Sequence, residues 1–324
     1  MKILLLTLFF ITNFSIMAVG IEKEPAKRVY FYNSNDQLCA IDFTGNRKQC
    51  YNVHSNFPQF QFSPDGKYLA TLSDKTLVIL DLNTNRITKL TSDEYSKYDF
   101  QWSPDSNFIA YIVQDSDANG DGRIDHRDKS SIVMINIINH KTTNLVLSGT
   151  DLSGAIYWSK TGKLIYFSRI IGSKKQVFMT VDIKDGEISK IAEAEWGTTS
   201  LDKMADSKYF HLNQNNSPNN DETKSSDYSA ENGQTVYAQR GNIYIKNDNN
   251  PPTVLLEFKD YDFKKNPGYY NPRWYDKTHI IAVGPAYKLP FLSNYLGKAI
   301  YVVDIEKMEK RKLVSGGSPG WLKF

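Results

Sequence analysis

Cysteine and histidine are scarce in this chain of 324 residues, which contains two cysteines and five histidines. The histidines show no His-x-x-x-His or similar ligand spacing, so the sequence offers no zinc-enzyme motif. An excess of one charge is also lacking, because 39 Lys and Arg face 36 Asp and Glu, for a net charge of +3. So small a surplus argues against a protein that binds nucleic acid through a basic field. We therefore expect no nucleic-acid partner.

Long apolar runs are missing after the first twenty residues. A basic start is followed by an apolar stretch over 3–17, too short to span a bilayer, and then by the small residues Ala18 and Gly20. We therefore expect residues 1–20 to be a cleaved signal peptide, with an uncleaved N-terminal anchor as the alternative. Residues 21–27 would form a short lead. The mature chain would have no membrane span and would be exported, either periplasmic or secreted.

The remaining composition is that of a folded protein rich in β-structure. Hydrophobic residues make up 40% and charged residues 23%, which is ordinary for globular proteins. Aromatic residues reach 13%, with 20 Tyr and 17 Phe, and this favours strands. General disorder is thereby excluded.

The two cysteines, Cys39 and Cys50, flank a turn signal at Thr44-Gly45. A two-residue hairpin loop centred there places Cys39 opposite Cys50, within disulfide reach. Because disulfides persist outside the cytosol, we expect a structural disulfide that closes a short loop, with two free buried thiols as the alternative. The pair lacks the Cys-x-x-Cys spacing that tunes a thiolate, so a redox-active role is not expected.

An internal repeat organises most of the chain. Each copy is a strand, a turn rich in Pro, Asp and Gly, and a second strand, and a further hairpin usually follows. Four strands in a unit of roughly forty or more residues correspond to one blade of a β-propeller. A protein with two β-domains is the alternative. The landmark aromatics of the successive copies are Phe62, Trp102, Trp158, Tyr228, Trp274 and Phe324.

The fold class that we predict is all-β, a six-bladed β-propeller of four-stranded blades over residues 28–324. The segment 28–53 supplies three strands but lacks the opening hairpin of a unit. The chain ends on 318–324, which is similar to the opening strand of a unit with nothing after it. We therefore expect the C-terminal strand to complete the N-terminal blade and close the ring, which leaves no raw edge strand.

The repeated motif resembles the WD-repeat-like propeller of the TolB family. Its core is an aromatic residue followed by Ser-Pro-Asp-Gly-Lys, as in 62–67, and then by Leu-Ala or Ile-Ala. The resemblance covers residues 28–324 and concerns the propeller alone, without the N-terminal domain of TolB. It implies a propeller fold and a role in binding other proteins of the cell envelope.

Two insertions stand out from the repeat, besides a smaller aromatic one over 284–296. The polar segment 213–227 is nearly devoid of apolar residues, and we expect a mobile loop there. The insertion over 115–128 has the layout of an EF-hand loop that starts at Asp117, with a glycine, Gly122, at the sixth position. The expected ligands are Asp117, Asn119, Asp121, the carbonyl of Arg123, Asp125 and Asp128.

These hard oxygen ligands suit Ca²⁺ better than Zn²⁺. The last position carries Asp in place of the usual Glu, and the loop joins two strands and not two helices, so we expect a structural site without a sensor motion. An acidic, solvated hairpin tip is the alternative.

The smaller insertion over 284–296 could be a contact loop or could pack on the ring.

No catalytic constellation is present in the sequence. A Gly-x-Ser-x-Gly match at 316–320 is followed by only four residues, none of them Asp, Glu or His, so it is a turn. The leading hypothesis is an exported, non-catalytic, monomeric propeller that binds another envelope or secreted protein. The alternative is a hydrolase or lyase that acts on carbohydrate or peptide in the central channel. A purely structural, Ca²⁺-stabilised module is a third possibility.

Overall fold

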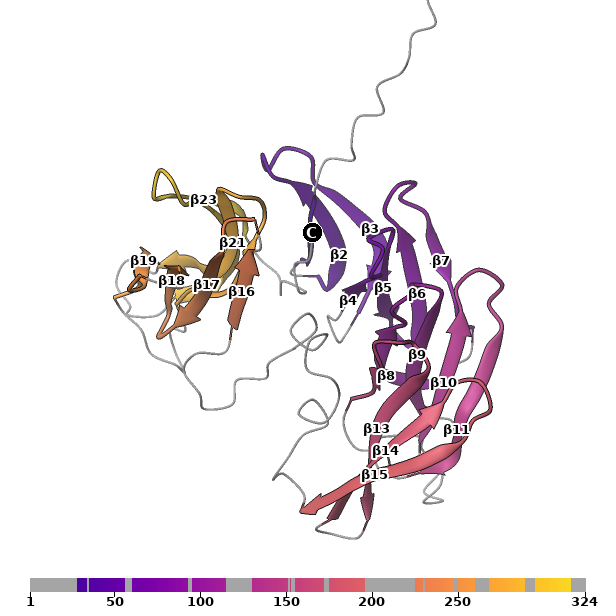
Figure 1. Ribbon diagram of the computed structural model, residues 1–324. Coiled ribbons are helices and arrows are strands. Elements are labelled where there is room, and N and C mark those ends of the chain that lie inside the picture. The colour runs from indigo at the N-terminus through magenta and orange to yellow at the C-terminus, as the bar shows by residue number, and fades with distance from the viewer. Residues whose placement is uncertain are drawn as a thin grey trace, which may run out of the picture.

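The computed structural model describes residues 28–33, 35–55, 60–92, 95–114, 130–150, 152, 155–171, 175–195, 225–229, 231–247, 250–259, 268–288 and 295–315. Within these ranges every regular element is a β-strand, and the strands form six antiparallel sheets (Figure 1). One sheet has three strands and five have four. The expected all-β class and the four-stranded units are thereby confirmed for the described part of the chain.

The sheets follow the chain order, and we number them accordingly. The first sheet consists of β1 (Arg28–Tyr32), β2 (Gln37–Asp42) and β3 (Gln49–His54). The second consists of β4 (Phe60–Phe62), β5 (Tyr68–Ser73), β6 (Thr76–Asp81) and β7 (Ile87–Lys89). The third consists of β8 (Ser96–Trp102), β9 (Phe108–Gln114), β10 (Ser130–Asn136) and β11 (Thr142–Thr150).

The last three sheets repeat this order. The fourth consists of β12 (Tyr157–Trp158), β13 (Leu164–Ile171), β14 (Lys175–Asp182) and β15 (Ile188–Glu195). The fifth consists of β16 (Ser225–Ser229), β17 (Gln234–Gln239), β18 (Asn242–Asn247) and β19 (Thr253–Leu256). The sixth consists of β20 (Tyr270–Trp274), β21 (His279–Lys288), β22 (Tyr295–Asp304) and β23 (Glu309–Ser315).

The repeated Ser-Pro-Asp turn is held by its own side chains. In the third sheet the Ser103 hydroxyl donates to Oδ1 of Asp105 (2.6 Å) and accepts from the amide of Phe108 (2.9 Å). The same Oδ1 accepts from the amide of Asn107 (3.1 Å). The turn therefore satisfies these polar groups with its own side chains, which accounts for the recurrence of the motif at the start of successive units.

The copy in the second sheet has the same geometry. The Ser63 hydroxyl donates to Oδ1 of Asp65 (2.6 Å) and accepts from the amide of Tyr68 (2.9 Å). The next position is left-handed, with φ of 74° at Gly66 and 63° at its counterpart Ser106 in the third sheet. Glycine adopts this region without steric cost, which accounts for the Gly in the motif.

A second repeated feature shows how the three-stranded sheet corresponds to the others. The second strand of the first sheet and the third strand of each other sheet end in Asp or Asn. At Asp81, for example, Oδ1 accepts from the amides of Asn83 (2.9 Å) and Thr84 (3.0 Å). Among the described residues the first sheet therefore matches the outer three strands of a four-stranded sheet, without the innermost one. The terminal residues are Asp42, Asp81, Asn136, Asp182, Asn247 and Asp304.

The landmark tryptophans tie neighbouring sheets together. The indole Nε1 of Trp102 donates to the carbonyl of Gln61 in the preceding sheet (3.1 Å). One sheet later, Nε1 of Trp158 donates to the carbonyl of Gln101 (3.0 Å). Each tryptophan therefore contacts the residue just before the landmark aromatic of its neighbour, and the repeat in the sequence becomes a repeat of inter-sheet contacts.

Apolar clusters fill five junctions between sheets. They join the first sheet to the second, the second to the third, the third to the fourth, the fifth to the sixth, and the sixth back to the first. Among the described residues no such cluster joins the fourth sheet to the fifth, and Figure 1 shows these two sheets apart. Accordingly Tyr228, the landmark of the fifth sheet, is 58% exposed, whereas Trp102 and Trp274 are 6% and 9% exposed.

One expectation about local structure was wrong. The loop of the first hairpin spans 43–48 in place of two residues, because the Asp42 carboxylate accepts from the Thr44 hydroxyl (2.7 Å) and the Asn46 amide (3.1 Å) and thereby builds a wider turn. Within the expected insertion over 284–296, β21 and β22 stay paired as far as Lys288 and Tyr295, so its described part is a lengthened hairpin.

We expect the Ser103→Ala variant to lose about 1 to 3 kcal/mol of unfolding free energy, because it removes both hydrogen bonds of a buried hydroxyl. Urea denaturation followed by tryptophan fluorescence would measure the loss. The control is Lys141→Ala at an exposed turn position of the same sheet, which should stay within about 0.5 kcal/mol of the parent protein. Equal losses in the two variants would contradict the capping role of Ser103.

Candidate functional site

The antiparallel order assigns every connection to one of two edges of the sheets. By edge we mean here the row of strand ends on one side of the sheets, and not an outermost strand. We call the edge that carries the repeated Ser-Pro-Asp turns the turn edge, and the opposite one the insertion edge. Turn edges of neighbouring sheets touch, because the Asp65 amide donates to the Ser106 hydroxyl (3.0 Å) and Nδ2 of Asn232 donates to the carbonyl of Lys277 (2.8 Å). The turns of neighbouring sheets therefore face the same way.

The long connections all start and end at the insertion edge. They are the connections of more than six residues, 115–129, 196–224 and 257–269, and all of their residues except 257–259, 268 and 269 lie outside the described ranges, although the strand ends on either side are described. On the turn edge the longest connection is 43–48. The sequence showed insertions, but only the strand order shows that they share one edge.

The expected calcium loop belongs to this edge. Its predicted ligands all lie outside the described residues, as do the expected signal peptide 1–20, the lead 21–27 and most of the polar segment 213–227, whose last residues belong to β16. The two strands that flank the loop are described, and Val113 of β9 pairs with Ser131 of β10. The ends of the loop are therefore held together at the insertion edge. The predicted ligands are Asp117, Asn119, Asp121, Arg123, Asp125 and Asp128.

A second constellation joins the first sheet to the sixth at the turn edge. The ring of Phe43 stacks on Tyr275 and contacts the edge of His279, each with a centroid distance of 4.7 Å. The Arg311 guanidinium donates to the carbonyls of Phe43 (2.6 Å) and Thr44 (3.2 Å). We call these five residues the seam. Sequence reasoning missed the seam, although an aromatic residue at a hairpin tip was a usable signal.

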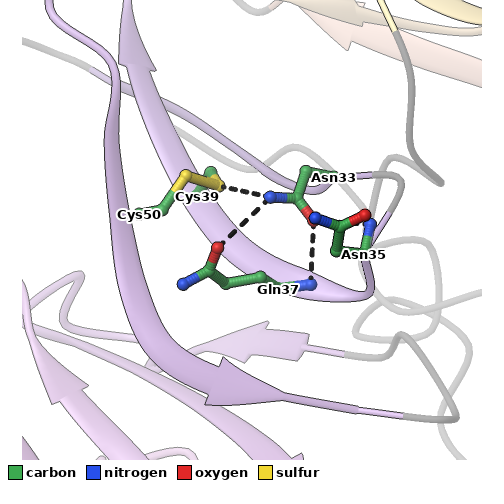
Figure 2. The surroundings of a disulfide bond; sticks show 5 residues. All are labelled: Asn33, Asn35, Gln37, Cys39 and Cys50. Carbon is green, nitrogen blue, oxygen red and sulfur yellow. Dashed lines mark hydrogen bonds between the residues drawn. A yellow bond between two sulfur atoms is a disulfide. The ribbon is translucent and has the colours of Figure 1, made fainter.

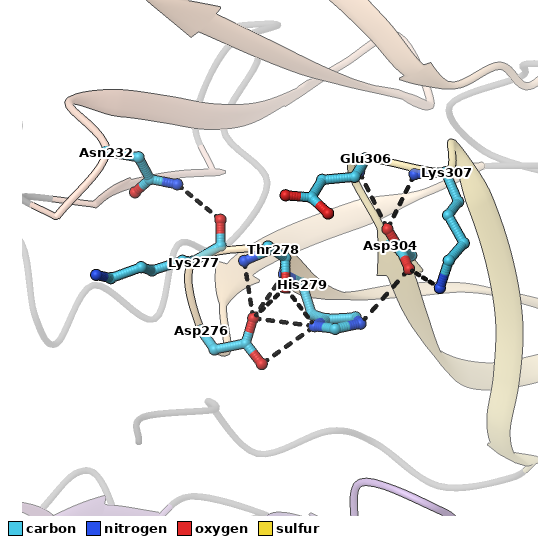
Figure 3. A network of polar contacts seen from close by, with 8 residues as sticks. All are labelled: Asn232, Asp276, Lys277, Thr278, His279, Asp304, Glu306 and Lys307. Atoms are coloured by element: carbon cyan, nitrogen blue, oxygen red, sulfur yellow. Dashed lines mark hydrogen bonds and ion pairs between the residues drawn. The ribbon is translucent and has the colours of Figure 1, made fainter.

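Figure 3 shows the polar network around His279. Its Nδ1 lies 3.0 Å from Oδ1 of Asp276 and 3.0 Å from the hydroxyl of Thr278, and its Nε2 lies 3.8 Å from Oδ2 of Asp304. Oδ2 of Asp304 also pairs with Nζ of Lys307 (2.9 Å). The sequence showed only that the histidines lack metal-ligand spacing. In the structure His279 both packs on the seam and is oriented by two carboxylates.

The same contacts set the charge state of the carboxylates. Partial burial raises the pKa of Asp276, but hydrogen bonds from the Thr278 amide and from His279 outweigh it, so the pKa lies below its usual value. Hydrogen bonds from the backbone and side chain of Lys307 lower the pKa of Asp304. Both groups are therefore carboxylates at neutral pH, and the arrangement can hold an imidazole ring in place. Within the described ranges no group of three or more His, Cys, Asp or Glu is suited to hold a metal ion.

The disulfide between Cys39 and Cys50 is present, as expected (Figure 2). The two residues are paired across β2 and β3, with a Cα–Cα distance of 4.0 Å, so the predicted register is confirmed. The bridge closes the hairpin whose tip carries Phe43 into the seam. A disulfide is consistent with an exported protein. In the described part of the chain no helix is long and apolar enough to cross a membrane.

Four-stranded antiparallel sheets packed side by side are the architecture of the β-propeller class. No family model and no curated protein matches the chain. The fold is similar to an acylaminoacyl peptidase of Pyrococcus horikoshii, with 14% identity, 86% of this chain and 48% of that chain covered, and a TM-score of 0.51. It is also similar to a prolyl endopeptidase, with 11% identity, 92% and 49% coverage, and a TM-score of 0.50.

A TolB structure from Agrobacterium tumefaciens also matches, with 15% identity, 91% of each chain covered and a TM-score of 0.39. Identities this low concern the fold alone, and the chain spans about half the length of the two peptidases. The similarities therefore support an all-β propeller architecture. The narrower TolB-like assignment continues to rest on the sequence repeat.

We expect the Asp276→Asn variant to be less stable than the parent protein at pH 7. The pKa of Asp276 is lowered in the folded state, so its stabilising effect is complete above the ordinary Asp pKa of about 3.9 and is lost as the pH falls through the folded value. Urea unfolding between pH 7 and pH 3 should show a stability difference that is constant above about pH 5 and shrinks below about pH 4. A difference that stays the same down to pH 3 would contradict this role.

Proposed function

We propose that the protein is an exported, non-catalytic, monomeric six-bladed β-propeller that binds another envelope or secreted protein through its insertion edge. The observation that carries the proposal is the contrast between the two edges. The turn edge is built of short turns whose polar groups are satisfied by side chains such as Ser103 and Asp105. The insertion edge carries every long connection, and long loops on a rigid scaffold are where binding residues are concentrated.

In the proposed ring the C-terminal segment 316–324 supplies the innermost strand of the first blade, beside β1. In the described part of the chain the first sheet has only three strands, and an apolar cluster that contains Phe31 and Ile300 joins the first and sixth sheets. A strand added there would cover the open edge of β1, which would otherwise be a template for pairing with another chain.

Export is supported by the disulfide and by the signal-peptide pattern over 1–20. The TolB-like repeat supports a partner in the cell envelope or the secreted space. An enzyme that acts on peptide or carbohydrate in the channel is the alternative, and the similarity of the fold to two peptidases favours it. Turnover of a peptide or glycan library by the purified mature protein would establish that alternative.

A pair of photo-crosslinking variants tests the binding proposal. Lys75 lies between β5 and β6 on the insertion edge, and Lys67 lies between β4 and β5 on the turn edge, and both are exposed. An interface of standard size covers roughly 800 Å² of one partner, so only one edge should be in contact. With a photoreactive residue at position 75, a single envelope protein should be captured at least about tenfold more than from position 67. Capture from position 67 alone, or from neither position, would contradict the proposal.

We also propose that the loop over 115–128 binds Ca²⁺, because its oxygen ligands have EF-hand spacing and its ends are held together by β9 and β10. For a dissociation constant of about 1 mM, 10 mM Ca²⁺ would stabilise the fold by about 1.4 kcal/mol, or roughly 3 °C in Tm. Asp121→Ala should abolish this rise in a thermal melt. The matched control is Asp115→Ala, just outside the twelve-residue loop, which should keep it. An undiminished rise in Asp121→Ala would remove the loop as the site.

A further inference from the structure

The two cysteines of the disulfide differ in their exposure to solvent. Cys39 lies on the central strand of the first sheet, is 0% exposed, and belongs to the apolar cluster that joins the first and sixth sheets. Cys50 lies on the outer strand β3 and is exposed. Thiol–disulfide exchange requires a thiolate to reach the sulfur that it attacks. Of the two residues, only Cys50 is open to such an approach.

The buried sulfur has a hydrogen-bond donor beside it (Figure 2). Nδ2 of Asn33 lies 3.5 Å from Sγ of Cys39. The other end of the same amide is engaged, because Oδ1 accepts from the backbone amides of Asn35 (2.9 Å) and Gln37 (3.1 Å). An oxygen occupied by two N–H groups leaves the NH₂ end directed at the sulfur and at Oε1 of Gln37, which lies 3.3 Å from Nδ2. That NH₂ group can donate to a thiolate more strongly than to a disulfide sulfur.

The exposure of Cys50 and the hydrogen-bond donor beside Cys39 both favour attack on Cys50. The exchange rate depends on which sulfur can be attacked and on how well the other leaves as a thiolate. Here the reachable residue is Cys50, and the leaving sulfur, that of Cys39, is the one that Asn33 stabilises. The missing Cys-x-x-Cys spacing excludes a thioredoxin-like catalyst, but it does not protect a bridge built in this way.

We propose that the disulfide is a directional thiol-exchange site whose substrate is an extracytoplasmic dithiol reductant. The thiolate of the reductant attacks Sγ of Cys50, the S–S bond breaks, and Cys39 leaves as a thiolate that accepts a hydrogen bond from Asn33. The second thiolate of the reductant then attacks its own sulfur in the mixed disulfide and releases Cys50 as a thiolate. The reductant is oxidised to a disulfide, and the protein gains two electrons and, on protonation, two thiol hydrogens.

Reduction loosens the seam in this proposal. The bridge ties β2 to β3 and closes the hairpin whose tip places Phe43 against Tyr275 and under the Arg311 guanidinium. Without the bridge the hairpin gains conformational freedom, and the contacts that its tip makes with the sixth sheet are held less firmly. The redox state of one bridge thereby regulates the contact between the first and the last sheet. This inference does not depend on the proposed partner-binding function.

The direction of attack is measured with reduced glutathione as the probe. The full mature protein is incubated with the monothiol, the reaction is stopped with iodoacetamide, and peptides are mapped by mass spectrometry. We expect the glutathione adduct on Cys50 and the carbamidomethyl group on Cys39. Adducts in equal amounts on both cysteines, or more on Cys39, would overturn the proposal.

The role of Asn33 is measured with two variants and dithiothreitol as the probe. Asn33→Asp keeps the oxygen that caps the turn but replaces the donor with a carboxylate, and should slow reduction at least about fivefold, the effect of losing one hydrogen bond to a charged group. Asn35→Ala keeps the backbone amide in the same turn and has no side chain at the sulfur, so its rate should equal that of the parent protein. Equal rates in Asn33→Asp and Asn35→Ala would refute the role of Asn33.

Coupling to the seam is measured by hydrogen exchange. In the reduced protein the amides of 43–49 and 309–315 should exchange faster than in the oxidised protein, whereas those of β5 and β6 in the second sheet should be unchanged. No difference at 43–49 and 309–315 would show that the bridge does not control the seam.

Discussion

Burial of sheet faces against neighbouring sheets is the interaction on which the rest of this structure depends. The central strands are buried along almost their whole length, as in β9 and β10, where successive side chains on both faces are covered. A single sheet cannot cover its own two faces, so it buries them against neighbouring sheets; among the described residues the fourth sheet has such a neighbour in the third and the fifth has one in the sixth. The five apolar clusters are the result, and the tryptophan-to-carbonyl contacts of Trp102 and Trp158 set the spacing between sheets.

The two edges of the sheets differ in the connections that they carry. The turn edge reverses the chain with residues that satisfy one another, such as Ser63 and Asp65, and therefore needs little from its surroundings. The insertion edge is then free to carry long segments without disturbing the cores. A rigid stack with a plain edge and an elaborated edge suits a protein that presents loops to a partner.

The contact between the first and sixth sheets stands apart from the other junctions. It joins segments that lie at opposite ends of the sequence, and it combines an apolar cluster with the seam around Phe43 and His279. Forming this contact lowers the conformational entropy of nearly the whole chain, because it closes a loop of that length. Any feature that already holds one of the two contacting segments in place therefore makes the contact more favourable. The disulfide orders the hairpin that carries Phe43, and this gives the exposed Cys50 a structural consequence beyond the first sheet.

Local features of the fold were determined by the sequence alone. The strands, their turns and the pairing of Cys39 with Cys50 follow from alternation and turn chemistry, which act over a few residues, and even the misjudged length of the first loop left that register intact. Only the tertiary structure decided which edge receives the insertions, that Arg311 binds the carbonyl of Phe43, and that one cysteine is buried while the other is exposed. These properties depend on which sheets become neighbours. The neighbours are selected by the burial of apolar faces, which is non-directional and acts between segments that are distant in the sequence. That selection is complete only when the whole chain has folded.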